Sequence, residues 1–180
     1  MPRRKTIPDA DVLRFADELL LEHGPYALTL QHISQRAGIA PSTLLQRFRS
    51  KDNLLTEVCR RHEEEIEARF QPKDLDSLGH ISAALRGLLA LQPGPAAAAQ
   101  RLAWLLSLGQ PALRQLEKCV QRSLWEAAKQ GQLKGAKGSE LAGEIVHLYL
   151  ATLLAWSIRG AIDPAEYMDA RLQFLLDRYR

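Results

Sequence analysis

The stretch that decides the fold runs from Thr29 to Lys51 and reads TLQHISQRAGIAPSTLLQRFRSK. Apolar residues recur in it at helical spacing, which predicts two short helices, one over residues 30–37 and one over 41–48. Gly38 tolerates the positive φ that a sharp turn between them needs, and Ile39 can fill the space between the helices. Two short helices joined in this way, and packed across a preceding helix, form a helix-turn-helix.

The second helix of this pair suits the major groove of DNA. Its early residues Pro41, Ser42 and Thr43 are small, so the backbone can approach the bases closely. Gln46 can read an adenine edge with two hydrogen bonds, and Arg47 can reach a phosphate or a guanine. The segment therefore indicates sequence-specific binding of double-stranded DNA.

The net charge of the chain is concentrated in its first third. The whole chain carries +3, and residues 1–51 alone account for that value, so the rest is neutral. A local basic patch favours a polyanion as partner, although a solvated surface explains the same charges equally well. The basic arm Pro2-Arg3-Arg4-Lys5 fits a minor groove or a row of phosphates, and it fits a solubilising tail as well.

Helical spacing continues along most of the chain, and the alternation typical of strands is almost absent. The sequence therefore predicts an all-α fold of about nine helices. We expect a DNA-binding head over residues 1–51, with its motif at 29–48, and a helical body over 52–180. Besides the pair above, the predicted helices cover residues 9–22, 50–70, 75–91, 96–108, 112–130, 139–159 and 163–179.

No pattern in the sequence indicates catalysis, a cofactor or a metal. The two cysteines, Cys59 and Cys119, are not at metal-ligand spacing. Glu144 and His147 have the Glu-x-x-His spacing of di-iron bundles, but the chain has no second such pair. Nucleotide-binding glycine loops and the hydrolase serine motif are also missing, so we expect no enzyme activity.

The segment from residue 28 to residue 54 resembles the TetR family of bacterial repressors. Such a resemblance implies a three-helix DNA-binding head, a larger helical body with an inducer pocket, and a homodimer formed largely by the last two helices. The matching residues are Thr29, Ile33, Ala37, Gly38, Ile39, Thr43, Leu44, Phe48, Ser50, Lys51, Asp52 and Leu54.

The resemblance also implies roles for single residues. Thr29 would bond a DNA phosphate from the start of one helix, and Lys51 would bond the other side of the same backbone. The family usually has Tyr where Leu45 stands, and Leu45 offers a thymine methyl only an apolar contact. Arg47 is therefore expected to replace the missing phosphate contact. Ala40 stands where the family usually has a serine cap, which leaves that helix start less well held.

An inducer pocket is expected among the helices of the body. Large aromatic side chains are natural walls for an apolar cavity, although they are also ordinary core residues. A basic residue among them suits a ligand with an acidic end, although such residues more often lie at the surface. The candidate pocket residues are Arg101, Trp104, Leu108, Trp125 and His147.

The segment 139–159 is apolar on nearly every side of its predicted helix. A helix of this kind is buried all round, and in so short a chain one side is expected to meet a second subunit. Its most apolar run, Ile145 to Ile158, is too short to span a bilayer. With no apolar leader after Met1, we expect a cytoplasmic protein without a membrane partner.

These observations favour a dimeric repressor that binds a palindromic operator and is released by a small, mostly apolar inducer. One alternative is an all-α ligand-binding or metal-binding protein with no DNA role, which the basic segment around residues 41–51 argues against. Another is a regulator of the same fold that a protein partner controls, which a closed, dry body would favour.

Overall fold

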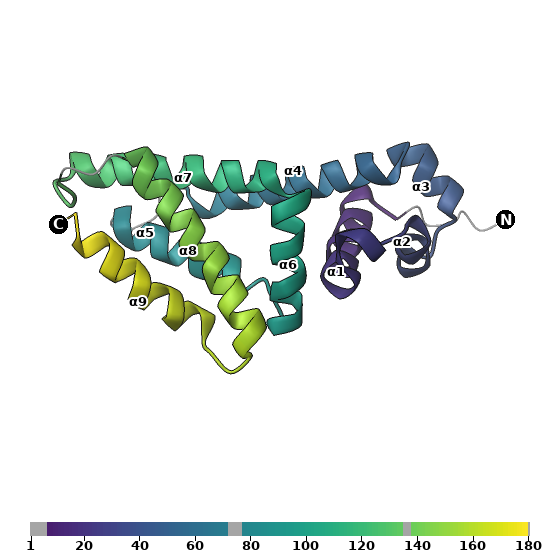
Figure 1. Ribbon diagram of the computed structural model, residues 1–180. Coiled ribbons are helices and arrows are strands. Elements are labelled where there is room, and N and C mark those ends of the chain that lie inside the picture. Colours follow the sequence, from purple (N-terminus) through teal and green to yellow (C-terminus); the bar gives the residue numbers. More distant parts are fainter. Residues whose placement is uncertain (1–6, 72–76, 135–137, 180) are drawn as a thin grey trace.

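The computed structural model describes residues 7–71, 77–134 and 138–179, and over these residues the chain is all-α, without a strand. Figure 1 shows an elongated molecule with the N-terminal helices at one end and the C-terminal helices at the other. The predicted fold class is confirmed. The helices of the described part are α1 (Asp9–Ala27), α2 (Leu30–Ala37), α3 (Pro41–Phe48), α4 (Lys51–Arg69), α5 (Ser77–Leu89), α6 (Pro95–Ser107), α7 (Gln110–Lys129), α8 (Gly138–Arg159) and α9 (Pro164–Asp177).

Local capping determines where the helices of the head begin and end. The side chain of Thr29 accepts a hydrogen bond from the backbone N–H of His32 at 3.2 Å and so caps α2. Gly38 ends α2 in the left-handed region at φ 66°, as the turn requires. Ala40 gives α3 no side-chain cap, as predicted, and Pro41 occupies its first turn.

The first helix is longer than the sequence predicts. The expected stop at His23-Gly24-Pro25 is present, since Gly24 has φ 77° and breaks the helical geometry. The chain then resumes one further helical turn from Pro25, whose fixed φ suits a new helix start. This break leaves Tyr26 85% exposed at the end of α1.

The long helix α4 connects the two ends of the molecule (Figure 1). The side chain of Ser50 accepts a hydrogen bond from the backbone N–H of Asn53 at 3.0 Å and begins the helix. One half of α4 packs on α1 and α3, and the helix also packs on α5 and α7 of the body. Helix α3 is fixed to this frame because Leu44 and Phe48 are buried.

The head and the body are in direct contact as well as being connected along the chain. Helix α6 packs extensively against α1 on one side and against α8 on the other. In Figure 1, α6 stands between the N-terminal helices and the rest of the body. The core is therefore one continuous set of buried side chains that extends from α1 to α9.

Helix α8 has 22 residues and contains an 18-residue window with a mean hydropathy of 1.5, so by length and composition alone it is able to cross a membrane. The 14-residue apolar run seen in the sequence underestimates it, because less apolar residues at both ends also join the helix. In the structure α8 packs against α6, α7 and α9, but only 39% of its apolar window is buried within the single chain, so one side of the helix stays exposed.

Candidate DNA-binding interface and the junction behind it

The outer surface of α3 presents the side chains that the sequence predicts to face DNA. Thr43 is half-buried, while the side chains on the open side of the helix are exposed. Leu45 is 46% exposed, which leaves its methyl groups available to a base. The exposed residues of this face are Pro41, Ser42, Leu45 and Gln46.

Thr29 and Lys51 flank this helix on the side of the α1–α2 connection. Thr29 is exposed at the start of α2. The Nζ atom of Lys51, at the start of α4, lies 3.5 Å from the carbonyl oxygen of Pro25. Both residues therefore stand at helix N-termini, where backbone N–H groups and the helix dipole favour a phosphate.

Arg47 is not free to contact DNA as the sequence predicts. Its guanidinium forms an ion pair with Asp9 and donates a hydrogen bond to the carbonyl oxygen of Ile7 at 2.8 Å. Only 18% of its side chain is exposed. The prediction that Arg47 replaces the missing phosphate contact therefore needs this ion pair to open first, because α3 turns the side chain toward α1.

Other basic side chains of the head are also paired. Arg36 bonds Glu22 at 2.8 Å and lies 3.6 Å from Glu18, and Arg14 bonds Glu18 at 2.7 Å. These pairs reduce the basic patch that the sequence count indicates. Among the residues of the head that the structure describes, Lys51 and Arg49 are in no ion pair; the basic arm at residues 2–5 lies outside the described residues.

Two exposed residues at this surface have no counterpart in the sequence prediction. Tyr26 stands beside Pro25, whose carbonyl faces Lys51, and it offers a phenolic O–H to a phosphate. Arg49 connects α3 to α4 at φ 67°, a strained conformation for a residue with a side chain. No sequence pattern singles out either residue, because only the fold shows that they are exposed.

Behind the DNA-facing surface, three polar side chains meet where α1, α4 and α6 converge. The Nη2 atom of Arg101 lies 3.1 Å and 3.2 Å from the two carboxylate oxygens of Asp17. The Nε2 atom of His62 lies 2.8 Å from Asp17 Oδ1 and 2.9 Å from Arg101 Nη1. This single ring nitrogen cannot donate to Asp17 and accept from Arg101 at the same time, so in any one tautomer only one of the two contacts is a hydrogen bond.

Two members of this junction are shielded from water, Arg101 and His62, whereas Asp17 is 28% exposed and, with His62, lines an open cavity of about 290 Å³. Arg101 is 3% exposed, and its Nε atom donates to Gln92 Oε1 at 3.4 Å. Its guanidinium also lies over the ring of Trp104, 5.1 Å from the centroid. Burial raises the pKa of Asp17, but the hydrogen bond with His62 and the charge of Arg101 outweigh it and hold the pKa at about 2.

The predicted pocket residues do not all come together. Arg101 and Trp104 line a cavity of about 30 Å³ between α4, α5, α6, α7 and α8, close to the volume of one water molecule. Leu108 and Trp125 are 49% and 58% exposed, and His147 is also exposed. None of these three lines the cavity beside Arg101, so their place in a ligand pocket stays a prediction. Trp125 instead stacks with Lys129, whose Nζ lies 3.0 Å from the ring centroid.

Comparison with known proteins agrees with this architecture. The family model described as bacterial regulatory proteins, tetR family, matches residues 12–58. A search of curated proteins gives no match. Among solved structures, the regulator FadR of Bacillus subtilis in complex with stearoyl-CoA has a TM-score of 0.77 at 16% identity, covering 96% of this chain and all of the other.

Two further structures have similar scores. NemR of Escherichia coli, in its reduced form, has a TM-score of 0.76 at 16% identity, covering 92% of this chain and 95% of the other. SmeT, the repressor of a multidrug efflux pump of Stenotrophomonas maltophilia, has a TM-score of 0.75 at 21% identity, covering 97% and 91%. At such identities the likeness concerns the fold. The segment of residues 12–58, which contains the helix-turn-helix at residues 29–48, matches the DNA-binding segment of the tetR family, and the chain as a whole has the fold of the transcription regulators above.

Proposed function

We propose that the chain is a cytoplasmic, homodimeric repressor that binds a near-palindromic operator and releases it when a small, mostly apolar ligand enters the body. The observation that carries the DNA role is the exposed face of α3 with Thr29 and Lys51 beside it. Thr29 and Lys51 hold the phosphates, while Ser42, Thr43 and Gln46 read base edges. TetR-family regulators are generally not enzymes, and no catalytic role is proposed here.

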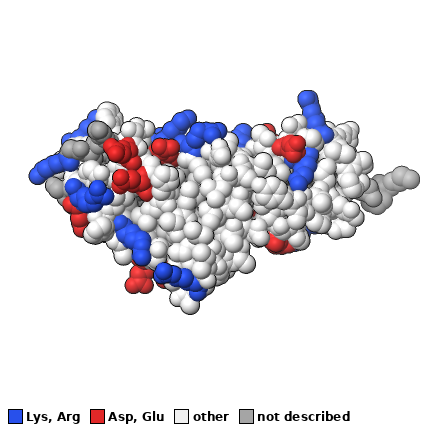
Figure 2. Space-filling model, viewed as in Figure 1, with Lys and Arg blue, Asp and Glu red and all other residues white. Residues whose placement is uncertain are grey.

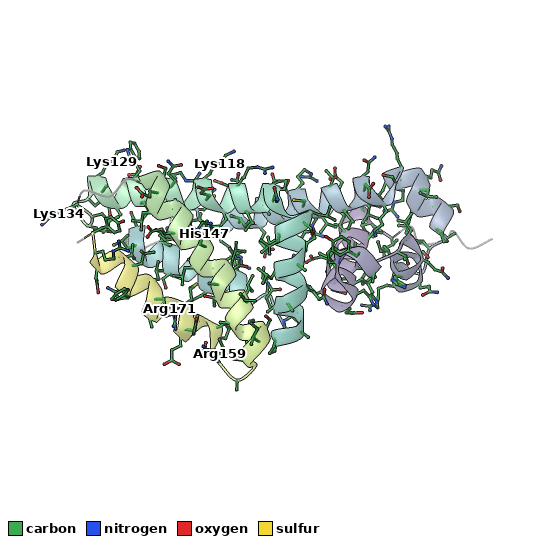
Figure 3. The ribbon with its side chains drawn as sticks, in the orientation of Figure 1. Lys118, Lys129, Lys134, His147, Arg159 and Arg171 are labelled. Carbon is green, nitrogen blue, oxygen red and sulfur yellow. The ribbon has the colours of Figure 1, made fainter. Side chains whose placement is uncertain are left out.

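An exposed apolar stripe on α8 and α9 supports the dimer. Ala151, Leu154 and Ile158 follow His147 along one side of α8, and Phe174 on α9 is 75% exposed. Both helices lie on the same face of the molecule in Figure 1, and Figure 2 shows a broad uncharged area in the middle of that face. His147 lies within it, with Arg159 and Arg171 nearer its margin (Figure 3).

A two-fold axis through this stripe would present two copies of α3 to one side of a DNA duplex. Recognition helices read successive major grooves when they are about 34–36 Å apart. The dimer thus explains why an operator for this protein should be nearly palindromic. Selection of bound fragments from random DNA tests this proposal. We expect two inverted half-sites about one helical turn apart. If the selection enriched no sequence at all, that result would contradict the DNA role.

The cavity beside Arg101 and Trp104 supports a ligand-controlled body. Most of its other walls are apolar, among them Leu88, Leu105 and Leu116, and His62 and Gln92 add polar groups. At about 30 Å³ it is far smaller than the several hundred Å³ of most ligand sites, so a ligand must open it. The structural relative in complex with stearoyl-CoA has a ligand with a long apolar part, which agrees with this expectation.

The small size of this cavity also favours a second candidate, a regulator whose body binds a protein partner and never opens. The two candidates differ in one measurement. A ligand that enters the body quenches the fluorescence of Trp104, which is 1% exposed, whereas a partner on the surface affects the exposed Trp125 first. Fluorescence of the variants Trp104→Phe and Trp125→Phe separates the two signals.

Removal of the Lys51 ammonium should weaken binding to all DNA sequences by a similar factor. The reason is that the ammonium of Lys51, at the start of α4, contacts a phosphate and displaces one counterion from the DNA. In Lys51→Ala this counterion stays on the DNA when the protein binds. We expect the slope of log K against log salt to fall by about one unit. Fluorescence anisotropy with labelled duplexes over a range of salt concentrations measures both quantities.

Gln46→Ala should act differently, because this residue reads a base. We expect a loss on the order of 1–3 kcal/mol for the preferred sequence, little loss for other sequences, and an unchanged salt slope. If Lys51→Ala altered the preferred sequence and kept the salt slope, the phosphate assignment would be wrong. Asp52→Asn, an exposed neighbour at the start of α4, serves as a control for a charge change at the same place.

A further inference from the structure

We propose that Arg101 is the binding residue for the carboxylate of an apolar acid, and that Asp17 of the head competes with this acid for the same guanidinium. A ligand of this class would therefore separate α1 from α6. The proposal rests on the proposed ligand-controlled body and specifies its ligand class and its coupling to the head. It follows from three features of the junction of Asp17, His62 and Arg101.

The first feature is the supply of hydrogen-bond donors at the cavity wall. Arg101 and Trp104 both line the cavity, and the indole N–H of Trp104 is buried without a hydrogen-bond partner among the described residues. Tyr149 lines it too, and burial raises the pKa of its hydroxyl to about 12, so the hydroxyl stays protonated. An unpartnered buried donor is costly, and a ligand oxygen at this place would relieve that cost.

The second feature is the apolar character of the remaining walls. Away from Arg101, the cavity is bounded largely by aliphatic side chains that contribute no hydrogen bonds. A ligand that fits them needs a hydrocarbon part and a single acceptor group at one end. The aliphatic residues are Ile66, Leu88, Leu91, Leu105, Leu113 and Leu116.

The third feature is the balance of charge around Arg101. Its guanidinium is 3% exposed and is neutralised by the carboxylate of Asp17. Arg69 is already paired with Glu65 at 2.9 Å, so it is not a second cation that is free to neutralise a ligand carboxylate. A second carboxylate at Arg101 would leave two anions sharing one buried cation, which is unfavourable. The ligand acid and Asp17 therefore exclude one another.

Displacement of Asp17 acts on the head because Asp17 belongs to α1 and Arg101 to α6. The same two helices touch at Gly24, where an added Cβ would lie 2.3 Å from the side-chain oxygen of Gln100. Helix α1 packs on α2 and α4, and these two helices in turn hold α3. A ligand that binds Arg101 only after Asp17 has left it favours the state in which α1 is separated from α6, because it has a higher affinity for that state. Conversely, the contact between α1 and α6 weakens ligand binding by the same factor.

Binding of decanoate to the full chain tests the proposal, with decanol and decylammonium as uncharged and positively charged controls. In the wild-type protein we expect decanoate to bind better than either control. In Asp17→Asn the competitor is gone, and we expect decanoate to bind about tenfold more tightly while decanol is unchanged. Calorimetry measures both affinities. Equal decanoate affinity in the two proteins, or no decanoate binding to either, would overturn the proposal.

A double variant guards against misfolding of Asp17→Asn, in which Arg101 is left unpaired. Asp17→Asn with Arg101→Met removes both charges, and it should bind decanol and decanoate equally. A retained preference for decanoate would contradict the role of Arg101. Hydrogen exchange gives an independent measurement: decanoate should speed the exchange of backbone amides in α1 of the wild-type protein, relative to those in α7.

DNA binding of the ligand-free protein, and its dependence on salt, is measured separately. Failure of the DNA role is therefore distinguishable from failure of the competition between Asp17 and the ligand.

Discussion

Replacement of Ile158 and Phe174 by glutamate should convert a dimer of about 40 kDa, twice the 20.2 kDa of the chain, into a folded monomer. Both side chains are about three-quarters exposed in the isolated chain, so the fold does not need them. In a dimer they would lie at an apolar interface, where a buried unpaired carboxylate is strongly unfavourable. Light scattering after gel filtration measures the mass, and the helical circular dichroism signal reports the fold.

The control for this experiment is Gln121→Glu, which adds one negative charge per chain, against two in the double variant, on the exposed side of α7. This variant should remain dimeric. A monomeric Ile158→Glu/Phe174→Glu protein should also lose affinity for a two-half-site operator far more than for a single half-site. A wild-type protein that is already monomeric at micromolar concentration would disprove the dimer.

Loss of the Asp17 carboxylate should lower the free energy of unfolding by about 3–5 kcal/mol at neutral pH, because Asp17→Ala leaves the buried charge of Arg101 unpaired. Asp11→Ala provides the control on the same helix. Asp11 lies 3.6 Å from Arg14, and both side chains are more than 40% exposed, so this change should cost below about 1 kcal/mol. Urea unfolding measures both values, and equal small losses would show that the junction does not stabilise the fold.

The pH dependence of this stabilisation has a definite sign. The pKa of Asp17 is about 2 in the folded protein and near 3.8 in an unfolded chain. The ionised carboxylate therefore stabilises the fold above pH 4, by about 2 kcal/mol, and this contribution is lost as the pH falls toward 2. The stability difference between wild type and Asp17→Ala should narrow over that interval. A constant difference from pH 6 to pH 2 would contradict the assignment to this carboxylate.

The sequence predicts those parts of the fold that depend on near neighbours. Thr29, Gly38 and Ser50 act within four positions along the chain, and the structure confirms the helix boundaries that they set. Asp163 likewise caps α9 by accepting hydrogen bonds from the backbone of the next two or three residues. Such local signals explain why the helix-turn-helix is recognisable before any tertiary contact is known.

The junction was not predictable in the same way. Asp17 and His62 are separated by 45 positions, and Asp17 and Arg101 by 84, so no spacing rule connects them. Arg101 was expected at a ligand or at the surface, and its pairing with the head depends on how α1 docks on α6. Similarly, helical periodicity places His147 on a definite face of α8, but it does not show that this face points outward.

The pairing of Asp17 with Arg101 also limits how such regulators can be recombined. A common engineering strategy transplants the DNA-reading helices of one protein onto the sensing helices of another, and the cut is usually made along the connecting helix. Here such a chimera would separate two halves of an ion pair, since Asp17 lies on one side of the cut and Arg101 on the other. If the transplanted DNA-binding helices had no acidic residue at the position of Asp17, the buried guanidinium of Arg101 would be unpaired at the junction of the two parts. The acid and the arginine therefore have to be exchanged together.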